Sequence, residues 1–212
     1  TTSSAVSVTV IGGLAPPLVA PSSLRLRLDA VGSMQVAANP TSPYVVGQDL
    51  LLLDQAGGLF RWEGPAVVSL LQASQAPDGV TAVGGESLIN AAGNADGTHL
   101  YVMFTSSTLP AGIPVHDSPR GDDDGWHVLV EYDFDGVSLR EGRPVVALAV
   151  RRDGHTGGGL VVLDDGAVLF ATGDNGDAGD DPAPYPQQSS NHVGKLLEID
   201  PADGSVAVRA LG

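Results

Sequence analysis

Short apolar runs separated by turn residues dominate this sequence and restrict the folds that it can adopt. The runs cover residues 5–11, 24–28, 34–38, 49–54, 57–62, 66–71, 87–92, 99–104, 126–134, 145–149, 159–163, 168–172 and 195–200. Many alternate with the two-residue period of half-buried strands, and none shows a convincing helical period. Gly, Pro, Asn and Asp, which favour turns, separate the runs. The sequence therefore predicts an all-β protein.

The runs fall into repeating groups whose spacing is typical of four-stranded antiparallel blades. These groups cover residues 34–71, 87–149 and 159–210. Repeating units of this kind predict a β-propeller, here one partial domain over residues 1–212 with about three blades. Known propellers need about four to eight blades to close a ring. Whether the strands expected in residues 1–28 help to close it stays open.

Composition excludes some classes of partner. The chain has 25 acidic and 10 basic residues, a formal net charge of −15. This balance argues against nucleic acid and anionic membrane surfaces, because phosphate binding needs clusters of Lys and Arg. No apolar run approaches the ~18 residues of a membrane span. The chain opens Thr-Thr-Ser-Ser without Met, as a protein does after loss of a signal peptide, which favours a secreted or periplasmic location.

One predicted hairpin brings two chemically useful residues together. The turn Asp164-Asp165-Gly166 joins the runs 159–163 and 168–172, and a glycine supplies the positive φ that a tight turn demands. His155 precedes the hairpin and Asp174 follows it. Antiparallel strands return their outer ends to the same edge of a sheet, so we expect the two side chains to converge there.

The order of four short motifs matches a known family. The motifs are His155-Thr156-Gly157-Gly158, Asp165-Gly166, Gly173-Asp174-Asn175-Gly176 and Gly194-Lys195-Leu196-Leu197. With these motifs the chain resembles the soluble pyrroloquinoline-quinone-dependent sugar dehydrogenases and the related hedgehog-interacting-protein-like propellers. The resemblance is strong over residues 128–200 and faint over 84–105. It implies a six-bladed ring, of which this chain would supply half.

The resemblance also implies roles for the residues around the hairpin. His155 would be the general base that takes the proton of a sugar hydroxyl, and Asp174 would orient that histidine or border the cofactor. Gly157 and Gly158 would let the backbone approach a flat cofactor. Read without the resemblance, His155 bonds a loop carbonyl and Asp174 bonds its own backbone in a turn.

Glu86 departs from the family pattern. It falls where catalytic members carry a glutamine that binds the cofactor, and Ser87 and Asn90 replace glycines of the same motif. A negative charge facing an anionic tricarboxylate quinone is unfavourable. This departure lowers the expectation of oxidoreductase activity.

The acidic loop DNGDAGDD, residues 174–181, is a candidate calcium site. Calcium takes six to eight oxygen ligands, so Asp177, Asp180 and Asp181 could contribute carboxylates. The spacing is not that of an EF-hand. A solvated acidic loop is the alternative interpretation.

Two functions of different class follow. The resemblance implies a quinoprotein oxidoreductase that oxidises an aldose sugar or related alcohol, with His155 as general base and hydride transfer to pyrroloquinoline quinone. The alternative is a non-catalytic propeller that binds a protein or a glycan. Either would need the second half of the ring, as another chain or a missing segment, or else as a second copy in a homodimer.

Overall fold

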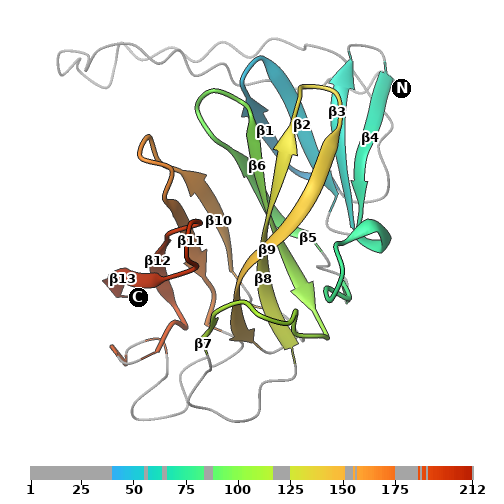
Figure 1. Ribbon diagram of the computed structural model, residues 1–212. Coiled ribbons are helices and arrows are strands. Elements are labelled where there is room, and N and C mark those ends of the chain that lie inside the picture. The colour runs from blue at the N-terminus through green and yellow to red at the C-terminus, as the bar shows by residue number, and fades with distance from the viewer. Residues whose placement is uncertain are drawn as a thin grey trace, which may run out of the picture.

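The part of the chain that the structure describes forms three antiparallel sheets, which follow one another along the sequence (Figure 1). The computed structural model describes residues 40–54, 57–63, 66–83, 88–116, 125–150, 155, 157–174, 186, 188–189 and 191–211. Each sheet holds four antiparallel strands, and the middle sheet gains a short parallel strand at its edge. The predicted all-β fold with about three four-stranded propeller blades is confirmed.

The strands have the following bounds. The first blade contains β1 (Pro40–Val46), β2 (Asp49–Asp54), β3 (Gly58–Glu63) and β4 (Ala66–Gln72). The second contains β5 (Leu88–Gly93), β6 (His99–Ser106), β8 (Gly125–Phe134) and β9 (Leu139–Val150), with β7 (Val115–His116) beside β9. The third contains β10 (Gly157–Val162), β11 (Val168–Thr172), β12 (Lys195–Ile199) and β13 (Val206–Leu211).

The first strand of the first blade differs from the sequence expectation. The sequence predicts this strand over residues 34–38, which lie outside the described residues, and Pro40–Val46 pairs with β2 instead. This segment contains Pro40 and Pro43, which argue against a central strand. It forms an edge strand, where a missing N–H costs little, and its register shifts between Pro40 and Ser42. Residues 1–28 also lie outside the described residues.

Among the described residues, two hydrophobic cores hold the blades together, one on each face of the second blade. Toward the first blade, Leu100, Val102 and Phe104 of β6 pack in one cluster with Leu51 and Leu59. Toward the third blade, the alternate residues Tyr101 and Met103 pack in a second cluster. Its partners from the third blade are Leu160, Val168, Phe170, Leu197 and Ile199. Because both faces of β6 are buried, its sequence is nearly continuous in apolar residues.

The first strands of the three blades lie next to one another. β5 contacts both β1 and β10, and Leu88–Ala92 are buried. This places the start of the β10–β11 hairpin, with His155 just before it, beside the innermost strand of the second blade. The candidate site is therefore built on the inner side of the blades.

Candidate functional site

The β10–β11 hairpin brings His155 and Asp174 together, as the sequence predicts. Gly157 pairs with Thr172, and the register then runs to Val162 and Val168 at the turn. At the open end, His155 Nδ1 lies 3.2 Å from Asp174 Oδ1. An ionised carboxylate only accepts hydrogen bonds, so Nδ1–H donates and Nε2 is left as the basic nitrogen. The imidazole side chain is 67% exposed, so a ligand can reach it.

Glycine permits the close backbone packing beneath this pair. A Cβ added to Gly173 would collide with the carbonyl oxygen of His155 and lie 2.6 Å from the amide nitrogen of Gly157. Gly157 itself has φ of +102°. His155 has φ of +57°, in the left-handed region that non-glycine residues seldom adopt. Residues with such backbone angles occur more often at functional sites.

Gly158 differs from these two glycines because it has space beside it. A Cβ there would meet only Ile89, at 4.0 Å. The exposed backbone of Gly157 and Gly159 continues on either side. A flat group could thus approach the strand next to His155, which is the role that the resemblance implies for Gly157 and Gly158.

The first residue of β12, Lys195, is a buried lysine that contacts residues before the strand. Lys195 is 3% exposed, and its ammonium donates to the carbonyls of Pro186 and, at 2.7 Å, Val193. No carboxylate pairs with it among the described residues, and burial lowers its pKa. The sequence places this residue in a motif but indicates no role for it. The one sequence feature that could have drawn attention to Lys195 is that it is the only lysine in the chain.

Other proposed site residues cannot be placed. Glu86 lies outside the described residues, and so do Asp177, Asp180 and Asp181. Within the described part of the chain, no group of three or more His, Cys, Asp or Glu side chains could hold a metal ion. The cofactor contact of Glu86 and the calcium site therefore stay predictions.

His127 is a second feature that sequence reasoning missed. It is fully buried between the second and third blades, with its ring edge-on to Phe170 at 5.6 Å between centroids. Neither ring nitrogen has a hydrogen-bond partner among the described residues. Burial, and to a smaller extent the charge of nearby His192, lower the pKa of His127 to about 3. His127 is thus a neutral core residue.

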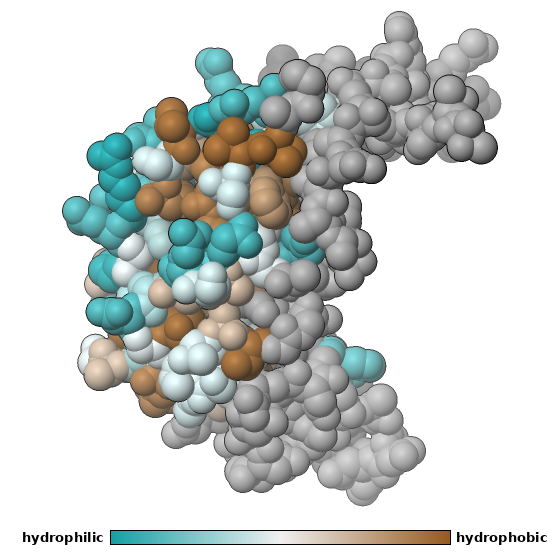
Figure 2. All heavy atoms as spheres, turned by 90° about the vertical axis from the view of Figure 1, so that its right-hand side faces the viewer, coloured by the Kyte–Doolittle hydropathy of each residue, from teal (hydrophilic) through white to brown (hydrophobic). Residues whose placement is uncertain are grey.

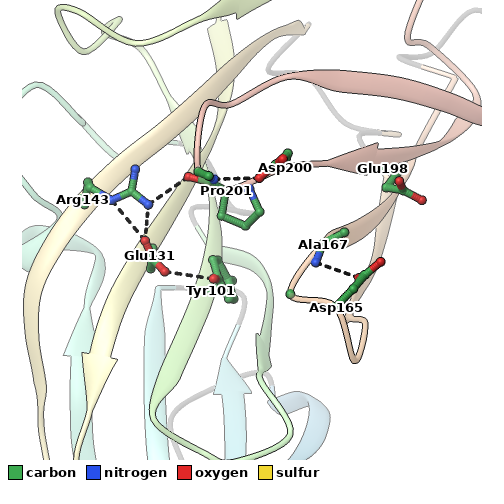
Figure 3. Close-up of a pocket in the computed structure, with 10 residues that line it drawn as sticks. Tyr101, Glu131, Arg143, Asp165, Ala167, Glu198, Asp200 and Pro201 are labelled. Atoms are coloured by element: carbon green, nitrogen blue, oxygen red, sulfur yellow. Dashed lines mark hydrogen bonds and ion pairs between the residues drawn. The ribbon is translucent and has the colours of Figure 1, made fainter.

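A cavity of about 450 Å³ lies away from His155, at the turn end of the same hairpin (Figure 3). Tyr101, Glu131 and Arg143 of the second blade line one side, and Asp165 and Glu198 of the third blade line the other. Arg143 bonds Glu131 and, at 2.9 Å, the carbonyl of Pro201. The described contacts of these residues connect the two blades.

Solved structures with the same fold include two glucose dehydrogenases. One, from Thermus thermophilus, is named as an oxidoreductase and glucose dehydrogenase; it is 16% identical, with a TM-score of 0.53. The second is named glucose dehydrogenase; it is 18% identical, with a TM-score of 0.51. Each alignment covers 81% of this chain.

These similarities have defined limits. This chain spans 45% and 44% of the two solved chains, less than half of each. No family model matches the sequence, and a comparison with curated proteins gives no match. The two solved structures thus place the chain in the fold of propeller-type glucose dehydrogenases.

The described residues contain no helix with the length and hydrophobicity that a membrane span needs.

Proposed function

We propose that this chain carries the proton-accepting part of a sugar dehydrogenase site that oxidises an aldose or a related alcohol. The observation that carries this proposal is the pairing of exposed His155 with Asp174 at the inner edge of the third blade. The fold shared with glucose dehydrogenases and the motif resemblance support the substrate class. A secreted or periplasmic location belongs to the same proposal.

His155 and Asp174 divide the proton chemistry between them. Oxidation of an alcohol to a carbonyl removes a proton from the hydroxyl oxygen and a hydride from the carbon. Nε2 of His155 accepts the hydroxyl proton as the hydride leaves. Asp174, on the opposite nitrogen, holds the ring in the productive tautomer and stabilises the imidazolium that forms.

The residues at this edge fit a flat cofactor beside the base. Gly157 and Gly158 would border pyrroloquinoline quinone, because Gly158 has open space where other residues carry a Cβ. The quinone, when bound, supplies the acceptor for the hydride. The described arginines bond acids or carbonyls elsewhere: Arg61 with Gly136, Arg140 with Asp135, Arg143 with Glu131 and Arg209 with Glu198. Cations for the quinone carboxylates are not among the described residues at this edge.

The test is sugar-dependent dye reduction by the purified chain with pyrroloquinoline quinone and calcium. We expect activity that falls by about 100-fold or more in His155→Ala, because general base catalysis contributes about that much. Binding of the quinone, followed by its absorbance, should persist in the variant. Equal turnover by parent and variant would remove His155 from the catalytic role. Binding of a glycan or protein with no dye reduction would favour the non-catalytic alternative.

A further inference from the structure

A buried cation joins two described residues, Pro186 and Val193, that precede β12. The ammonium of Lys195 donates to carbonyls at both ends of residues 186–193, from Pro186 and Val193. A buried ammonium needs such oxygens, because it has lost the water that would solvate it. Loss of the ammonium would leave these two carbonyls without their described donor.

Lys195 is connected to the His155–Asp174 pair by a short series of backbone contacts. The amide of Gly194, next to Lys195, donates to the carbonyl of Gly173 at 2.8 Å. Gly173 in turn packs against the carbonyl of His155 and directly precedes Asp174. A shift of Gly194 would therefore move the residue that sets the distance between the imidazole and the carboxylate.

Thr172 strengthens the same connection from the opposite strand. Its hydroxyl donates to the carbonyl of His192 at 2.6 Å and accepts the amide hydrogen of Lys195 at 2.8 Å. Asn191 accepts the amide hydrogen of Val193 at 2.9 Å. Residues 191–193, which lead into β12, are thus held in place directly before Lys195.

We infer that Lys195 is a positioning residue, whose buried ammonium fixes the backbone at Gly173 and thereby holds the Asp174 carboxylate against Nδ1 of His155. The inference deepens the proposed function and rests on it for its catalytic meaning. The claim that Lys195 positions Asp174 against His155 does not depend on any enzymatic activity. It can be tested on the purified protein without substrate or cofactor.

The measurement is the tautomer of His155, read from long-range ¹H–¹⁵N spectra of the labelled chain. In the parent, the bond to Asp174 should make the Nδ1–H form dominant. Lys195→Met should shift the ratio of Nδ1–H to Nε2–H by about tenfold, as loss of a hydrogen bond to a charged group does. Asp174→Ala should give the same shift, and the double variant should shift no further.

Chemical rescue separates the ammonium from the bulk of the side chain. The chain has no cysteine, so Lys195→Cys creates one alkylation site. Treatment with 2-bromoethylamine under denaturing conditions, followed by refolding, restores an ammonium of similar reach. The treated protein should regain the parent tautomer. Unmodified Lys195→Cys, carried through the same cycle, is the control and should not.

Several outcomes would overturn the inference. The inference is wrong if the Nδ1–H form is not dominant in the parent, or if Lys195→Met folds and keeps the tautomer ratio of the parent. It is also wrong if alkylation of Lys195→Cys does not restore that ratio. If Lys195→Met does not fold, the unmodified Lys195→Cys protein also lacks the ammonium, and the parent tautomer in that protein overturns the inference equally. A tautomer that responds as expected in a protein without dye reduction would support the positioning role and contradict the proposed function.

Discussion

The carbonyl oxygen of His155 occupies the space that a side chain at position 173 would need. This packing holds the two ends of the hairpin close enough for the imidazole to meet the carboxylate of Asp174, 3.2 Å away. At the scale of single residues, the site thus depends on a missing Cβ as much as on the two polar groups. Replacement of particular glycines separates these contributions.

Gly173→Ala should destabilise the chain and separate His155 from Asp174. The added Cβ has no free space, and overpacking of this kind costs roughly 1–3 kcal/mol. Urea unfolding measures the loss. Gly158→Ala is the matched control for stability, because its Cβ would meet only ordinary contact at 4.0 Å. Equal stability of the two variants would show that the packing at Gly173 is loose.

Asp174→Asn should lower dehydrogenase activity with little change in stability, because the amide no longer stabilises the imidazolium through a full charge. The loss should appear in kcat, since the proton moves only in the chemical step. Asp135→Asn, in the turn between β8 and β9, is a control away from the site. Unchanged kcat in Asp174→Asn would make Asp174 a turn residue.

His127 predicts an acid sensitivity of the interface between the second and third blades. Its pKa is about 3 in the folded chain and near 6.5 when unfolded, so the unfolded state binds more protons between these values. Stability from this residue is complete above pH 6.5 and is lost as the pH falls toward 3. One pKa unit corresponds to about 1.4 kcal/mol, so the full loss is on the order of 5 kcal/mol.

His127→Leu removes this titration and should flatten the decline of stability below pH 6.5. Urea unfolding of parent and variant at pH 7.5 and pH 4.5 measures the difference, and the comparison cancels the carboxylates that both proteins share. A parallel pH dependence of parent and His127→Leu would refute the prediction.

At the scale of elements, strands with clear alternation were predictable and the others were not. The hairpin 159–172 and the convergence of His155 and Asp174 followed from its turn and antiparallel pairing. Strand β1 did not, because Pro40 and Pro43 are tolerated only at an edge that a sequence does not identify. β7 was not predicted either: it lies between the predicted strands 99–104 and 126–134, and two residues show no period. The surroundings of Lys195 depend on tertiary contacts from Pro186, beyond any local pattern.

Arg143 should contribute more to stability than its exposure suggests, because it joins two blades. Arg143→Met removes the contacts with Glu131 and the Pro201 carbonyl, which should cost about 1 kcal/mol. Arg140→Met is the matched control: Arg140 contacts Asp135 within one hairpin, so the change should stay within about 0.5 kcal/mol. Urea midpoints measure both. Equal midpoints would show that the contact across the blades contributes nothing.

At the scale of the whole molecule, the outer faces of the first and third blades lack a described blade beside them. On the third blade, Val161 is 55% exposed, on the face opposite to Leu160, and Leu169 and Leu196 are half-buried. On the first blade, Val45 is 74% exposed, and hydrophobic side chains gather in the upper part of the side shown in Figure 2. Faces of this kind pack against further blades in repeat folds.

We predict that the purified 212-residue chain does not persist as a monomer. It should bind a complementary half of the ring or, less favourably, form a two-fold dimer, because apolar blade faces favour burial. Sedimentation velocity over a hundredfold range of concentration measures the mass. Val161→Glu should weaken association, whereas Val137→Glu, at the exposed turn between β8 and β9, should not. A monodisperse monomer at every concentration would contradict the prediction.

The order of the blades along the chain also has a consequence for synthesis on the ribosome. The first core needs Leu51 and Leu59 from the first blade and Val128 and Val130 from the second, so it cannot close until β8 has left the exit tunnel. At about 5–20 residues per second, β2 waits several seconds for these partners. During that interval its apolar face is open to chaperones and to neighbouring nascent chains. Slower translation between β4 and β8 should therefore reduce the yield of folded protein, whereas slower translation after β13 should leave it unchanged.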